Sequence, residues 1–104
     1  LGDVYKRQVL EYRGAFLNTG DDTLSFNGRS IPLSKNEYRI LLCLMENRGK
    51  IVSRERLMER LWKTQQFVDE NTLTVNINRL RKKLDAAGLT DFITTKVGLG
   101  YLVE

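Results

Sequence analysis

The chain has 104 residues, a length typical of one domain, and 41% of them are apolar while 29% are charged. It is too apolar to be disordered and too charged to be embedded in a membrane, which favours an ordinary soluble globular fold. The net charge of +4 is compatible with a polyanionic partner but does not identify one.

The side chains that catalysis and metal binding most often need are scarce. With no histidine and one cysteine, Cys43, the chain lacks a zinc-ligand set, a Ser-His-Asp triad and a Cys-His pair. We therefore predict a domain that is not an enzyme and has no catalytic residues, cofactor or metal. Cys43 lies in an apolar run, residues 40–45, as a small buried hydrophobe would, and a single thiol favours a reducing cytoplasmic location. That run is far shorter than the ~20 residues of a membrane span, and residues 1–10 lack a signal-peptide pattern.

Residues 9–33 alternate and turn like short antiparallel strands. Glycine-bearing turns, including the Asn27-Gly28 hairpin signal, separate the expected segments. The segments are Val9–Tyr12, Ala15–Asn18, Thr23–Phe26 and residues 29–33. Residues 1–8 begin without Met and fit no element, so we expect them to be a non-native or disordered leader and assign the domain to residues 9–104.

Two helices are predicted after the strands. Ser34, with Glu37 three residues later, has the pattern of a capping box, and the helix that follows is expected to end at Gly49. Ser53 is expected to cap the second helix, whose apolar stripe finishes at Trp62.

A third helix is predicted from Asp69, as its cap, to about Ala86. On a helical wheel, one narrow apolar arc must face the core: Leu73, Ile77, Leu80 and Leu84. The opposite arc carries amide and cationic groups with one valine: Asn71, Val75, Asn78, Arg79 and Lys82. Arg can bridge guanine O6 and N7, Asn can pair with adenine, and a small apolar side chain can contact a thymine methyl group. This face predicts binding in a DNA major groove, and the alternative is a merely solvated basic face.

The chain closes with a predicted hairpin, residues 92–103, which has a glycine-bearing tip with Lys96 close to it. A cation there is suited to the negative potential of a neighbouring DNA groove. The order of elements predicts an α+β fold: a winged helix-turn-helix with an N-terminal four-stranded antiparallel sheet, three helices and a C-terminal β-hairpin wing.

Three segments, in order, resemble the C-terminal effector domain of OmpR/PhoB-type two-component response regulators. They are LSKNEYRILLCLMENRGKIVSRERLMERLW, VDENTLTVNINRLRKKL and ITTKVGLGYLV. The resemblance covers residues 9–104 and implies sequence-specific binding of double-stranded DNA at direct repeats in promoters. It also implies a receiver domain and a sensor kinase for the full-length protein. We expect the isolated domain to be a monomer and to form a tandem dimer on DNA.

The resemblance further implies roles for individual residues. The base-reading positions fall on Thr74, Val75 and Arg79. The phosphate-contacting positions fall on Trp62, Thr72, Asn76, Asn78, Arg81 and Tyr101. Charge and position add Lys82, Lys83 and Lys96 as expected contacts to the DNA backbone. One loop resembles a segment that contacts RNA polymerase, and its alternative is a plain connector: Lys63, Thr64, Gln65, Gln66 and Phe67.

The chain departs from the resemblance at the wing. Many members place an Arg directly before the first wing glycine, where this chain has Val97, so we expect the third helix to be the sole reader of sequence. The wing and the third helix look most like the subgroup that responds to envelope stress from antimicrobial peptides such as bacitracin. The rival hypothesis is a protein-interaction module that docks on RNA polymerase or another partner, because fold alone does not exclude it. RNA binding is a weaker third option, since no exposed aromatic pair on the sheet is expected.

Overall fold

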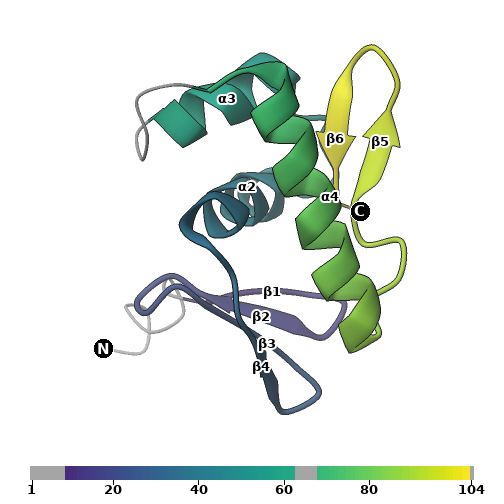
Figure 1. The fold of residues 1–104 in the computed structure, drawn as a ribbon. Helices are drawn as coiled ribbons and strands as arrows, with labels where there is room; N and C mark the ends of the chain where they lie inside the picture. The colour runs from purple at the N-terminus through teal and green to yellow at the C-terminus, as the bar shows by residue number, and fades with distance from the viewer. Residues whose placement is uncertain (1–8, 63–67, 104) are drawn as a thin grey trace.

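The computed structural model describes residues 9–62 and 68–103, so the predictions for residues 1–8 and 63–67 lie outside the described part of the chain. An antiparallel sheet with strand order β1-β2-β3-β4 comes first (Figure 1). Its strands are β1 (Val9–Tyr12), β2 (Ala15–Asn18), β3 (Thr23–Phe26) and β4 (Arg29–Ile31). The predicted fourth strand is two residues shorter than expected, because Pro32 has no N–H to donate to a ladder.

Alternation along the strands gives this sheet one buried face. Leu17 is paired with both Leu10 and Leu24, and Leu24 is paired with Ile31. Three of these four side chains are buried, and Leu10 packs against the core from its edge. The Asn27-Gly28 turn has positive φ at both residues, as the predicted two-residue hairpin requires.

Three helices are present in the described ranges: α2 (Lys35–Glu46), α3 (Arg54–Trp62) and α4 (Glu70–Ala87). The predicted capping box of α2 is confirmed, since Ser34 Oγ accepts from Glu37 N at 3.2 Å and Glu37 Oε1 accepts from Ser34 N at 2.8 Å. Asp69 caps α4 by accepting from Thr72 N at 2.8 Å. None of the helices in the described residues is long and apolar enough to cross a bilayer.

The wing consists of β5 (Thr94–Lys96) and β6 (Gly100–Leu102), and backbone hydrogen bonds attach it to the segment before α3. Val52 N donates to Tyr101 O at 2.8 Å, and Tyr101 N donates to Val52 O at 3.0 Å. A Cβ at position 100 would lie 2.0 Å from Val52 O, so only glycine allows this approach.

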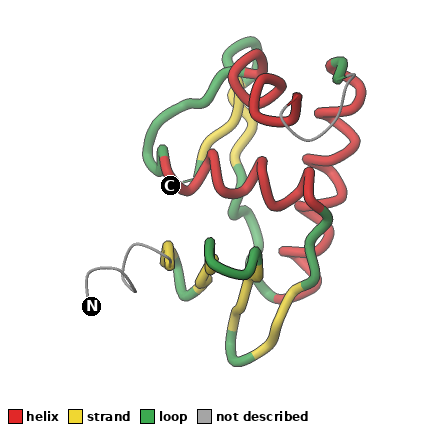
Figure 2. Tube along the Cα trace, turned by 90° about the vertical axis from the view of Figure 1, so that its left-hand side faces the viewer, coloured by secondary structure: helices red, strands yellow, loops and turns green. Residues whose placement is uncertain are grey.

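The core lies between the sheet and the three helices, and the inner side of the wing adds Tyr101 to it. Figures 1 and 2 both show the four-stranded sheet at one end of the molecule and the wing at the other, with α2 and α4 between them. The apolar arc predicted for the third helix is confirmed, because Leu73, Ile77, Leu80 and Leu84 are all buried. Cys43 is also fully buried, as expected. The predicted α+β winged helix-turn-helix fold is confirmed.

Candidate nucleic-acid interface

The outer face of α4 is polar and exposed, as the helical wheel predicted. It carries Asn71, Val75, Asn78, Arg79 and Lys82. The side chains of Arg79 and Lys82 form no hydrogen bond or ion pair with another described residue, so both can bind an external ligand. Val75 is an exposed apolar side chain, 36% accessible, in the middle of this polar face. Donors, cations and one small apolar group are the components of base-edge recognition in a major groove.

Arg54, the first residue of α3, connects α4 to the wing. Its Nη1 donates to Tyr101 Oη at 2.8 Å, and its Nη2 donates to Thr74 Oγ1 at 3.0 Å and to the Glu70 carbonyl at 3.4 Å. Sequence reasoning did not single out Arg54, because its partners lie 16 to 47 residues further along the chain and no local pattern connects them.

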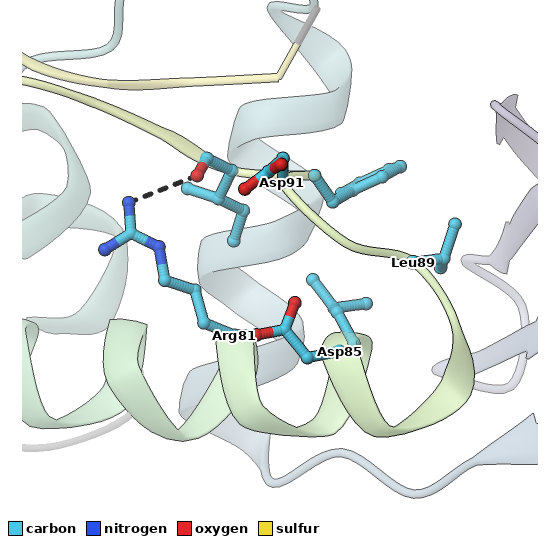
Figure 3. Close-up of a pocket in the computed structure, with 7 residues that line it drawn as sticks. Arg81, Asp85, Leu89 and Asp91 are labelled. Atoms are coloured by element: carbon cyan, nitrogen blue, oxygen red, sulfur yellow. Dashed lines mark hydrogen bonds between the residues drawn. The ribbon is translucent and has the colours of Figure 1, made fainter.

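A second arginine, Arg81 on α4, also connects α4 to the wing. Arg81 donates to the Ile93 carbonyl at 3.2 Å and to Thr95 Oγ1. Figure 3 shows its side chain reaching from α4 toward the segment that precedes β5. The guanidinium carbons of Arg54 and Arg81 lie 5.8 and 5.7 Å from the centroid of the Tyr101 ring. Tyr101 is only 4% exposed, and a cation close to an aromatic ring is attracted to it.

The hollow beside Arg81 in Figure 3 is small. Its volume is about 70 Å³, and Asp85, Leu89 and Asp91 are among the residues that line it. Pockets that take small molecules usually measure ~300 Å³ or more. No group of three or more potential metal ligands occurs among the described residues. The exposed face of α4, with its donors, cations and one apolar group, is the candidate binding surface that we consider.

Several residues expected to contact the DNA backbone have intramolecular partners, and two of them, Asn76 and Lys83, are drawn away from the outer face of α4. Asn76 is buried, 7% exposed, and its amide donates to the Thr72 carbonyl at 2.8 Å. Lys83 donates to Glu37 Oε1 at 2.6 Å and to the Pro32 carbonyl at 2.9 Å. The wheel placed both at the flank of the outer face, but packing against the core and the start of α2 turns them away. We revise their expected role from phosphate contact to intramolecular support.

Glu37, the partner of Lys83, is buried and ionised. Burial raises the pKa of Glu37, but the hydrogen bonds from Lys83 and Ser34, together with the Lys83 charge, outweigh this effect. The net pKa of Glu37 lies below its ordinary value. The carboxylate thus links the N-terminus of α2 to the C-terminal half of α4 and fixes the helix that bears the polar face.

The other expected contacts lie on three elements near α4. Trp62, at the end of α3, is 62% exposed and is not packed into the core. Thr72 is partly exposed, and its hydroxyl donates to Asp69 Oδ1 at 2.8 Å. Lys96 lies on β5 next to Val97, whose side chain is 93% exposed at the wing tip. The loop expected to contact polymerase falls on residues 63–67, outside the described residues.

The fold and this surface define a class: a winged helix-turn-helix domain with an exposed polar helix beside its wing. The family described as "Transcriptional regulatory protein, C terminal" matches residues 28–103. The chain therefore belongs to this family, and it is a DNA-binding effector domain of the OmpR/PhoB response-regulator type. The resemblance seen in the sequence is confirmed.

Individual relatives agree with this assignment. The sensory transduction protein BceR of Bacillus subtilis is 50% identical over 91 residues, which are 88% of this chain and 39% of BceR. The response regulator GraR of Staphylococcus aureus is 41% identical over 95% of this chain and 44% of its own length. The chain thus spans less than half the length of the curated relatives it matches. The solved C-terminal domain of the nisin resistance regulator NsrR has a TM-score of 0.77 and 40% identity, over 90% of this chain and 95% of that one.

Proposed function

We propose that α4 enters the major groove of promoter DNA and reads its sequence with Thr74, Val75 and Arg79. The observation that carries this proposal is the exposed face of α4, where Arg79 and Val75 lie side by side in helical spacing without a described intramolecular partner for the guanidinium. An exposed valine among donors is better matched to a thymine methyl group than to water.

Contacts to the DNA backbone come from residues around that face. We assign them to Trp62, Thr72, Asn78, Lys82 and Lys96, with Arg81 and Tyr101 contributing while they hold the wing. Phosphate contacts fix the register of the helix on the duplex, whereas base contacts give specificity. Val97 is a poor substitute for an arginine in a minor groove, so the wing contributes affinity rather than sequence preference.

The regulatory setting of the domain is proposed from its relatives. We infer a longer cytoplasmic protein in which a receiver domain, acted on by a sensor kinase, promotes tandem occupancy of direct repeats. The similarity to NsrR, a lantibiotic response regulator, supports a response to antimicrobial peptides such as bacitracin that stress the cell envelope. For residues 63–67 we propose RNA polymerase as the partner, on the resemblance of that segment to the polymerase-contacting loop of the family.

Selection of duplexes from a random library tests the function. We expect enrichment of a repeated half-site with a spacing of about 10–11 base pairs, because one helical turn brings both copies to the same side of the DNA. The domain should be a monomer by sedimentation when free and should bind the selected duplex as two copies. If no sequence were enriched, or if binding to duplex were insensitive to salt, the protein-interaction alternative would replace this proposal.

A further inference from the structure

The Arg54 guanidinium lies between two hydroxyl groups that belong to different DNA-facing elements. Thr74 is on α4, and Tyr101 is on β6 of the wing. We propose that Arg54 is a positioning residue, which orients the Thr74 and Tyr101 hydroxyls as hydrogen-bond donors toward DNA and sets the wing against α4. This inference rests on the proposed function of α4 and adds a specificity determinant that does not itself read a base.

The hydrogen-bonding chemistry of arginine gives the direction of each bond. A guanidinium has five N–H donors and no acceptor, so Thr74 Oγ1 and Tyr101 Oη both accept from it at 3.0 and 2.8 Å. Each hydroxyl then keeps its own hydrogen for another acceptor. The neighbouring positive charge also disfavours the approach of a further donor. Both groups are therefore prepared to donate.

Donor character has a consequence for the bases that Thr74 prefers. The acceptors in the major groove are N7 and O6 of guanine, N7 of adenine and O4 of thymine, whereas cytosine offers a donor through its amino group. Thr74 is expected to select an acceptor at its position and to reject cytosine. The Tyr101 hydroxyl is suited in the same way to a phosphate oxygen, which only accepts.

The attachment of Tyr101 explains why one arginine affects both elements. Its backbone is paired with Val52, two residues before Arg54, and its ring lies beside the guanidinium of Arg81. Arg54 thus closes a connection from the start of α3 to the wing and to the N-terminal half of α4. Loss of its side chain would leave the Thr74 and Tyr101 hydroxyls without their common donor.

The test compares Arg54→Gln with Arg56→Gln, which removes an equal charge from an exposed arginine on the same helix. The probes are the duplex that wild type enriches from a random library and a scrambled duplex of equal length, each measured over a series of salt concentrations. We expect R54Q to lose about tenfold more affinity than R56Q for the enriched duplex. Affinity for the scrambled duplex should fall equally in both variants, with equal salt slopes.

Double-mutant cycles identify the groups through which Arg54 acts. Thr74→Val and Tyr101→Phe each remove a hydroxyl, and we expect their effects on the enriched duplex to be much smaller in R54Q than in wild type. Full additivity would overturn the proposal. So would a loss in R54Q that is equal for both duplexes, with a salt slope lowered by about one more than in R56Q, since this marks a direct phosphate contact.

Two further readouts keep the proposal testable. If R54Q fails to fold by circular dichroism, T74V in the presence of Arg54 must reduce the preference for the enriched duplex, Y101F must weaken binding to both duplexes, and the selection repeated with T74V must accept cytosine. Unchanged base preference in T74V would overturn the proposal. Failure of the proposed function itself would be distinct, because wild type would then enrich no duplex at all.

Discussion

Lys83 and Glu37 form an ion pair at 2.6 Å across 46 residues of sequence, between α4 and the capping box of α2. Glu37 is nearly inaccessible, while the Lys83 side chain remains 37% exposed. One carboxylate oxygen therefore accepts from the N-cap backbone of α2 and from the ammonium group of α4. This contact separates the neighbours Lys82 and Lys83, which are chemically alike, into an outward and an inward role.

Substitution of these two neighbours should separate DNA binding from stability. Lys82→Ala is expected to weaken binding to all duplexes alike and to lower the salt slope by roughly one, as loss of one phosphate contact does. Lys83→Ala should leave the slope unchanged and lower the free energy of unfolding by about 1–2 kcal/mol, since it leaves a buried carboxylate without its ammonium partner but the pair is partly screened by solvent. Salt titrations of binding and urea unfolding provide the two measurements. A lowered slope in K83A would return that residue to the DNA interface.

The stability of the domain should fall in acid because of Glu37. Its pKa is lowered in the folded state, so its contribution is complete above the unfolded pKa of about 4.3 and is lost as pH falls through the folded value. The difference in the free energy of unfolding between wild type and Glu37→Gln should therefore shrink as pH falls below about 5. Glu46→Gln, which removes a carboxylate from the more exposed pair with Arg60, is the control and should change stability little. A constant difference between wild type and E37Q from pH 7 to acid would contradict the linkage.

Arg79 should carry specificity for one base pair. Arg79→Ala is expected to cost about 1–3 kcal/mol on the selected duplex and to relax selection at a single position. The effect on scrambled duplex should be limited to the loss of one charge. Arg29→Ala, which removes an exposed arginine from β4, is the matched control. It should change neither the base selected at that position nor the preference for the selected duplex over the scrambled one. Equal losses on both duplexes in R79A would assign Arg79 to the phosphates instead.

Gly100 should be far less tolerant of a side chain than Gly98, although both lie in the wing and have positive φ. Gly98→Ala meets only backbone strain, about 1–2 kcal/mol, because no atom lies within 4 Å of the added Cβ. Gly100→Ala would place the same carbon 2.0 Å from Val52 O and break the bridge between Val52 and Tyr101. We expect a clearly larger drop in Tm for G100A than for G98A. Similar melting temperatures would show that the bridge is dispensable.

Many elements of the fold depend on interactions between residues that are close in the chain, so the sequence predicts them. The capping box of Ser34 and Glu37 and the Asn27-Gly28 turn depend on groups within four residues of each other. The buried arc of α4 follows from 3.6-residue periodicity, which also predicts the exposure of Val75 and Arg79. Hydrogen bonding within a turn and the burial of an apolar stripe are set by neighbouring residues, so the pattern alone was sufficient.

The tertiary structure decided how the flanks of α4 are used. The helical wheel predicts that Asn76 and Lys83 face DNA like their exposed neighbours. In the structure, Asn76 is buried and Lys83 is paired with Glu37 at the start of α2. Arg54 gave no signal at all, because its role exists only when α3, α4 and the wing come together. Amino-acid sequence by itself determined the elements and the outward face of the recognition helix. Packing between distant elements determined which cations remain available to DNA, since a long polar side chain takes whatever partner the assembled fold brings within hydrogen-bonding distance.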